Sequence, residues 1–125
     1  MGPANVKVIH AHDFVRARPG GVLDLETSEA LLLEIAKAAD GLDRVEVLID
    51  TRRAEGQLGA ADLWFLADRL ARHRHAFSGK TAVLCPMERF DRALFFALLA
   101  DSKGFDVEAF TSYEEAVTWL SGDPA

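Results

Sequence analysis

Residues 45–85 read VEVLIDTRRAEGQLGAADLWFLADRLARHRHAFSGKTAVLC, and this stretch decides the fold. It opens with the run VEVLID (45–50) and closes with TAVLC (81–85), two short apolar runs with β-branched residues of the kind found in buried strands. Between them the sequence predicts a helix over residues 60–75. The apolar face of that helix consists of Leu63, Leu66, Ala67 and Leu70. Because strands joined by a helical crossover of this length are almost always parallel, we predict an α/β unit.

The same alternation continues toward the C-terminus. Pro86 closes the second strand and suits the start of a helix predicted over residues 87–103, which ends at Gly104. Residues 105–110 form the next predicted strand. Ser112 and Glu115 then have the spacing of a capping box before a last short helix.

Upstream of residue 45 the sequence predicts a pair of strands. VKVIHAH (6–12) and residues 14–18 each alternate with a period of two, as strands do. Pro19, Gly20 and Gly21 follow with the chemistry of a turn. The front of the chain is therefore expected to be a strand pair.

A helix is predicted next, over residues 28–39. We expect Thr27 or Ser28 to be its N-cap, because hydroxyl side chains accept from the free N–H groups of a first helical turn. Gly41 is positioned to stop this helix in the left-handed region. Its apolar stripe contains Leu31, Leu32, Ile35 and Ala39.

Length and composition fit one globular unit. The chain has 125 residues, of which 50% are apolar and 27% charged, so residues 1–125 are expected to form one domain. The net charge of -6 disfavours nucleic acid as a partner. No run is long enough for stable membrane insertion and no secretory signal is evident, so the expected location is cytoplasmic. A single cysteine excludes an intramolecular disulfide.

Several segments together resemble STAS domains, the family of the anti-sigma factor antagonists. GVLDLETSEALLLEI (21–35) is similar to the family's G-x-L-D-x-x-T-x-x-x-L opening, and the resemblance continues through VLID (47–50), the helix after it and TAVLC (81–85). The tail FTSYEEAVTWL (110–120) resembles the SpoIIAA-like branch, which is grouped with lipid-transfer folds of the CRAL-TRIO type. The resemblance implies a STAS-like, mixed but mostly parallel sheet of about five strands with four main helices.

The phosphorylation site of that family is not matched. In the antagonists, a serine in an Asp-Ser-Ser-Gly turn at the start of the second helix is phosphorylated by a partner kinase. This chain has Gly59, Ala60, Ala61 and Asp62 there, and neither alanine carries a hydroxyl. The resemblance therefore implies the fold and a tendency to bind a protein or a small ligand, without the phosphorylation switch.

A dense polar cluster follows the first central strand, and it is the candidate partner-binding site. Ligands of open α/β sheets gather outside the carboxyl ends of the strands, and arginine forks suit carboxylates or phosphates. The alternative interpretation is a solvated loop. The candidate residues are Asp50, Thr51, Arg52, Arg53, Gln57 and Asp62.

Large apolar side chains left outside the predicted core indicate a homodimer. Residues 94–100 are apolar on every face of a helix, and such a helix must be covered on all sides. Phe65 lies away from the core stripe of its own helix. The predicted dimer interface is therefore Phe65, Phe95 and Leu99.

Histidine and cysteine do not suggest a cofactor or a catalytic centre. His10 and His12 share a strand face, but no further ligand completes a metal site. His73 and His75 lie on different sides of a helix. Cys85 follows a strand at the edge where ligands bind, yet no histidine is placed to activate it, so we interpret it as a small buried apolar residue.

The sequence thus predicts a regulatory or binding module that is not an enzyme and needs no cofactor or metal. Its expected partners are another protein, a second copy of itself, or both. The alternative function is a small carrier that holds an apolar or lipid-like ligand against the Phe-rich helix near residues 90–99. A bound ligand in the purified protein would distinguish the carrier from the module.

Overall fold

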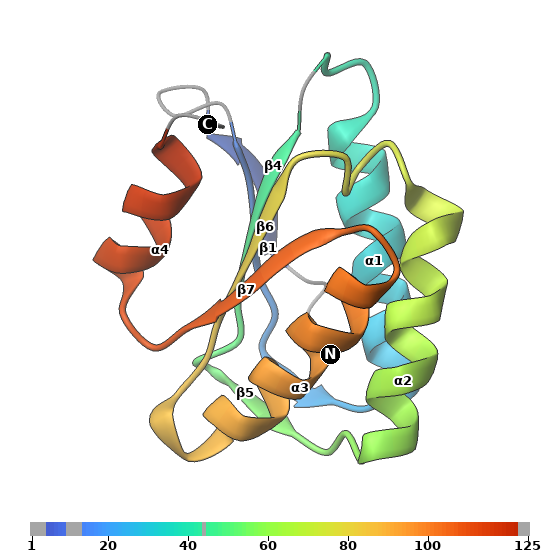
Figure 1. Cartoon of the computed structure of the whole chain (residues 1–125), viewed down its shortest axis with the longest axis vertical. Coiled ribbons are helices and arrows are strands. Elements are labelled where there is room, and N and C mark those ends of the chain that lie inside the picture. Colours follow the sequence, from blue (N-terminus) through green and yellow to red (C-terminus); the bar gives the residue numbers. More distant parts are fainter. Residues whose placement is uncertain (1–4, 10–13, 44, 123–125) are drawn as a thin grey trace.

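The computed structural model describes residues 5–9, 14–43 and 45–122. Its centre is a five-stranded sheet, with helices α1, α2 and α3 on one face and α4 on the other (Figure 1). The strands, in spatial order, are β1 (Asn5–Ile9), β2 (Phe14–Arg18), β4 (Glu46–Asp50), β6 (Lys80–Leu84) and β7 (Asp106–Phe110). The helices are α1 (Leu25–Ala39), α2 (Ala60–Arg69), α3 (Phe90–Ser102) and α4 (Tyr113–Ser121).

The predicted fold class is confirmed. β1 is antiparallel to β2, whereas β2, β4, β6 and β7 are parallel to one another. The strands predicted over residues 45–50, 81–85 and 105–110 each match an observed strand to within one residue at either end. The predicted strand over 6–12 is observed as Asn5–Ile9, and His10 and His12 lie outside the described residues.

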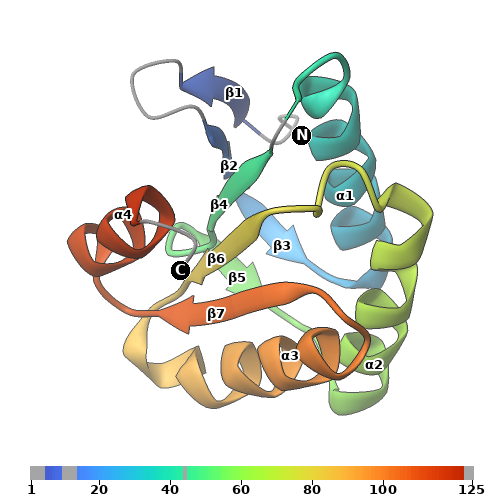
Figure 2. The same ribbon diagram turned by 45° about the horizontal axis from the view of Figure 1, so that its top comes forward.

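A second, two-stranded sheet was not predicted. β3 (Gly21–Leu23) and β5 (Ala54–Gly56) pair in parallel beyond the carboxyl ends of the central strands (Figure 2). One of these strands, β5, lies between the first central strand and α2, where the sequence predicts no strand. Each strand has three residues, which is too short to show a periodic pattern.

Helix α1 begins earlier than predicted, and its predicted N-cap is wrong. Asp24 is the N-cap: its carboxylate accepts the Thr27 N–H at 2.9 Å, and the Thr27 hydroxyl accepts the Asp24 N–H at 3.0 Å. This reciprocal pair satisfies two free donors and moves the helix start to Leu25. At the other end, Gly41 has φ of 86°, so its predicted role as the stop is confirmed.

The predicted helix over residues 60–75 is also too long. α2 ends at Arg69 and continues as the 3-10 helix η1 (Leu70–His73). A turn follows, in which Ala76 donates its N–H to the His73 carbonyl at 2.9 Å. The turn brings Phe77 into the core. A similar 3-10 turn, η2 (Met87–Arg89), precedes α3.

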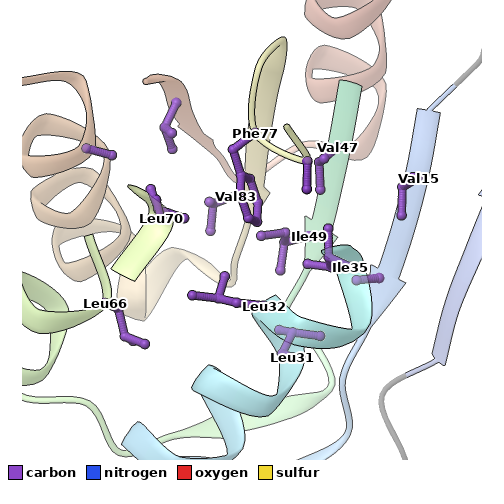
Figure 3. Close-up of a cluster of buried hydrophobic side chains, with 14 of the residues drawn as sticks. Val15, Leu31, Leu32, Ile35, Val47, Ile49, Leu66, Leu70, Phe77 and Val83 are labelled. Carbon is purple, nitrogen blue, oxygen red and sulfur yellow. The ribbon is translucent and has the colours of Figure 1, made fainter. Parts of the chain in front are cut away.

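Side chains of the central strands alternate between two cores. Val47, Ile49 and Val83 pack with α1 and with Phe77 on one face (Figure 3). Leu48 and Leu84 point to the opposite face, and the α4 residues Ala116 and Leu120 cover them. Alternate residues of one strand therefore serve different faces of the sheet. Within the described chain, no helix is long and apolar enough to cross a membrane.

Candidate functional site

An apolar pocket of about 410 Å³ lies at the carboxyl ends of β4 and β6, on the face that α1, α2 and α3 cover. Its size falls in the range of about 300–1,000 Å³ that is usual for small-molecule sites. β3 and β5 contribute Leu23 and Gly56 at its end. The side chains that form its walls include Leu31, Ile49, Leu66, Val83, Ala93 and Phe96.

Two arginines line the mouth of this pocket. Arg89 donates from Nη2 to the Thr51 carbonyl at 2.7 Å, and Arg92 donates from Nη1 to the Leu58 carbonyl. A Cβ atom at residue 56 would lie 2.7 Å from Cδ of Arg89, so Gly56 leaves the space that this arginine occupies. The exposed Gln57 lies beside them.

A separate polar group occupies the α4 face of the same strand end. Asp50 is 5% exposed. One of its carboxylate oxygens accepts a hydrogen bond from Nε of Arg52 and the other accepts one from Nη2, each at 2.9 Å. Nε of Arg18 lies 3.7 Å from the same carboxylate. The guanidinium of Arg52 lies 5.9 Å from the ring centre of Tyr113, which ties the group to α4.

This environment lowers the pKa of Asp50 below its ordinary value of 3.8. Burial alone would raise the pKa of Asp50, but hydrogen bonds from the Arg52 side chain and backbone, together with the charges of Arg52 and Arg18, outweigh burial. The carboxylate is therefore ionised and held by arginines at neutral pH. It is not poised to take up a proton as a general base.

Asp50 should therefore stabilise the fold only above acidic pH. A carboxyl whose pKa is lower in the folded chain than in the unfolded one contributes stability above the unfolded value, and the contribution is lost as pH falls through the folded value. We expect the wild type to exceed Asp50→Asn in free energy of unfolding at pH 7, and the difference to shrink below about pH 4. Urea unfolding of both chains from pH 7 to pH 3 measures it. A difference in free energy of unfolding that stays the same from pH 7 to pH 3 would contradict a lowered pKa of Asp50 in the folded chain.

The predicted partner-binding residues divide between these two places. Asp50 and Arg52 bind each other on the α4 face, whereas Thr51 and Gln57 line the pocket on the other face. Asp62 accepts the Gly59 N–H at 2.9 Å and so caps α2. The remaining candidate, Arg53, is exposed and forms no ion pair within the described chain.

Sequence reasoning missed the pocket and its two arginines. Arg89 and Arg92 stand at the start of α3, directly after the carboxyl end of β6, where ligands of open α/β sheets bind. In the sequence, the signal for a binding site was that both arginines follow the predicted strand over residues 81–85 within a few residues. The cavity itself depends on how three helices pack, which no local pattern encodes.

Cys85 lines the pocket as a buried thiol. Burial raises the pKa of Cys85, and the nearby charge of Arg89 offsets this only in part. Its Sγ lies 3.6 Å from the Phe110 carbonyl. The thiol is therefore protonated at neutral pH, which does not suit a nucleophile. Among the described residues, no group of three or more candidate ligands could hold a metal ion.

The predicted dimer residues differ in exposure. Phe65 is half-buried beneath Arg69, whose guanidinium lies 4.2 Å from the ring centre and pairs with Glu29 at 3.1 Å. Leu99 is also half-buried, whereas Phe95 is 40% exposed. The exposed apolar surface of α3 consists of Phe95 with Leu94 and Leu98, two residues that the sequence did not single out.

The sequence matches no family model and no curated protein. Solved structures nevertheless share its architecture, which places the chain in the class of SpoIIAA-like folds. An uncharacterized protein of the DUF3478 family with a SpoIIAA-like fold, from Shewanella loihica PV-4, has a TM-score of 0.62 and 18% identity, over 94% of this chain and 91% of its own. The anti-sigma factor antagonist SpoIIAA in its unphosphorylated form has a TM-score of 0.58 and 18% identity, over 96% and 99%. The predicted resemblance is confirmed for the fold.

Proposed function

We propose that this protein is a small, non-enzymatic cytoplasmic module that holds an apolar ligand in the pocket between α1, α2 and α3. The pocket is the observation that supports this function. The sequence favours a regulatory module and gives the carrier as the alternative, and we propose the carrier on the strength of this pocket. In this proposal the ligand occupies the inner side of α3, where Ala93 and Phe96 line the pocket.

The chemistry of the lining supports binding without catalysis. The walls are aliphatic and aromatic, so they supply burial and few polar groups. Cys85 is a protonated thiol, and the nearby carboxylates of Asp50 and Asp62 are engaged by Arg52 and by the backbone of Gly59. The Cys85 thiol lines the pocket, whereas the pair of Asp50 and Arg52 lies on the α4 face and Asp62 caps α2.

A neutral fluorescent probe tests the pocket directly. N-phenyl-1-naphthylamine should bind the wild type with enhanced emission. Ala93→Phe, which places a ring inside the pocket, should abolish most of that emission. Leu94→Phe is the matched control, because Leu94 is the next residue on the same helix and is exposed. Equal emission from both variants, with melting temperatures near that of the wild type, would contradict a ligand pocket at this place.

Recognition of a protein partner at the strand end is the second candidate function. Arg53 is exposed, and Arg52 is fixed beside it by Asp50, so the two guanidiniums offer donors to an acidic protein surface. Ala60 and Ala61 at the start of α2 lack a hydroxyl, so we propose that this recognition is not switched by phosphorylation there. Arg53→Ala should leave the melting temperature nearly unchanged and weaken capture of any partner that the wild type retrieves. If Arg53→Ala binds that partner with the affinity of the wild type, Arg53 is only a solvated side chain and this candidate function is contradicted.

We further expect a homodimer through the exposed side of α3. Phe95, Leu94 and Leu98 form a continuous apolar surface there, and such surfaces usually mark interfaces. Light scattering should give twice the mass of the chain for the wild type and the single mass for Phe95→Glu. Leu33→Glu, at an exposed leucine on α1, is the control that should remain dimeric. A monomeric wild type would contradict this expectation.

A further inference from the structure

Arg89 and Arg92 differ from Arg18, Arg52 and Arg69 in having no acidic partner. Arg18 and Arg52 lie beside Asp50, and Arg69 pairs with Glu29. Among the described residues, no carboxylate forms an ion pair with Arg89 or Arg92, and both contribute to the lining of the apolar pocket. Two arginines without an ion-pair partner therefore line an apolar cavity, and the exposed Arg92 places one of them where the cavity meets solvent.

Both side chains are fixed by backbone carbonyls and retain free donors. Arg89 binds the Thr51 carbonyl from across the end of β4, and Arg92 binds the Leu58 carbonyl just before α2. A guanidinium carries five N–H donors, and these contacts use only part of them. The anchored forks can therefore bind a further acceptor without first being ordered.

The charged side chains of the lining are Arg89 and Arg92; Ser28, Thr51, Gln57 and Cys85 are polar, and the other lining residues are apolar or glycine. Leu31, Leu66 and Val83 form the interior and offer no hydrogen-bonding side chain, so a polar group buried among them would be left without a partner. An apolar chain fits the interior, and a charged group fits only at the mouth. The chain carries a net charge of -6, so an anion is attracted by these two arginines and not by the protein as a whole.

We propose that the pocket binds an amphiphile with a single alkyl chain and an anionic head group, a carboxylate or a phosphate, which Arg89 and Arg92 hold at the mouth. This inference rests on the proposed ligand pocket and adds the chemical class of the ligand. The alkyl chain lies between α1, α2 and α3. Planar, forked donors suit both kinds of oxyanion.

Displacement of the naphthylamine probe by four twelve-carbon ligands, each below its micelle concentration, tests the head group. The ligands are dodecanoate, dodecyl phosphate, dodecanol and dodecyltrimethylammonium. On the wild type, at least one anionic ligand should bind about tenfold more tightly than dodecanol, as expected for a charge-assisted hydrogen bond. The cationic ligand should be the weakest. The tighter of the two anions identifies the head group.

Variants assign this selectivity to the two arginines. Arg92→Gln and Arg89→Gln should each bring the affinity for the preferred anion toward that of dodecanol, while the affinity for dodecanol stays the same. Arg72→Gln, at an exposed arginine of η1 away from the pocket, should retain full selectivity. Because Arg89 also anchors the end of β4, its variant is interpreted only if its melting temperature is near the wild-type value, and Arg92→Gln carries the test if it is not.

The outcomes separate this inference from the proposed function. If dodecanol binds as tightly as both anions, the head group is not recognised, but the pocket still binds a ligand. If the variants keep the selectivity of the wild type, other residues bind the anion and the assignment to Arg89 and Arg92 is wrong. If neither the probe nor any ligand binds, the proposed function itself fails.

Discussion

Replacing Phe77 with alanine is expected to lower the free energy of unfolding by about 3–5 kcal/mol, because it removes a large aromatic side chain from a close-packed core. Phe77 is 2% exposed and belongs to the cluster that joins α1 with β4 and β6 (Figure 3). Domains of this kind are stable by about 5–15 kcal/mol in total, so the loss would be a large fraction of that stability.

Phe95→Ala is the matched control, because it deletes the same ring from a side chain that is 40% exposed. Measured at a concentration where light scattering shows only monomers, the cost there should be well below that of Phe77→Ala, since the Phe95 ring is largely exposed in the single chain. Urea unfolding followed by circular dichroism compares the midpoints of the two variants. Equal losses in the monomer would mean that Phe77 is not packed as described.

Gly79→Ala should be the next most damaging of the substitutions considered. A Cβ atom at residue 79 would lie 2.3 Å from the Val45 carbonyl oxygen and 2.7 Å from Oε2 of Glu46. The backbone cannot yield without disturbing the start of β4, where that glutamate also accepts the Lys80 N–H at 2.8 Å. Overpacking of this kind costs about 1–3 kcal/mol.

Gly20→Ala provides the comparison for that experiment. A Cβ atom at residue 20 would meet no heavy atom within 4 Å, so the methyl group fits without movement. Its effect should be near zero or slightly stabilising, by about 0.4–1 kcal/mol, because alanine restricts the unfolded chain. If both glycine variants unfold at the wild-type midpoint, the close approach at residue 79 is not as described.

The elements that could be predicted are those whose residues repeat a pattern over several turns or strand periods. Residues 45–50 and 81–85 are buried on both sides, which makes them continuous apolar runs, and the helix between them keeps one apolar face. The predicted start of α1 was wrong because the prediction assigned the N-cap to a hydroxyl side chain, Thr27 or Ser28. In the structure, Asp24 is the N-cap and forms a capping box with Thr27.

The sequence predicts the candidate residues as one cluster at the carboxyl ends of the strands, whereas the structure divides them between two faces. Asp50 and Thr51 are adjacent in sequence, yet successive residues of an extended chain point to opposite faces. Asp50 therefore joins Arg52 near α4, while Thr51 joins the pocket. The pocket is a property of tertiary packing, since its walls come from three helices and four strands that are far apart along the chain.

The small β3–β5 sheet has a consequence for the motions of the protein. Two paired strands of three residues each are marginal on their own, so their hydrogen bonds should open far more often than those of the central sheet. Local opening at Leu23 and Gly56 would uncover the end of the pocket without unfolding the domain. Amide hydrogen exchange in residues 54–56 should therefore be faster than in β4, and a bound ligand should slow it. Amide hydrogen exchange in β5 and the entry or release of a ligand would then both depend on the same local opening of β3 and β5.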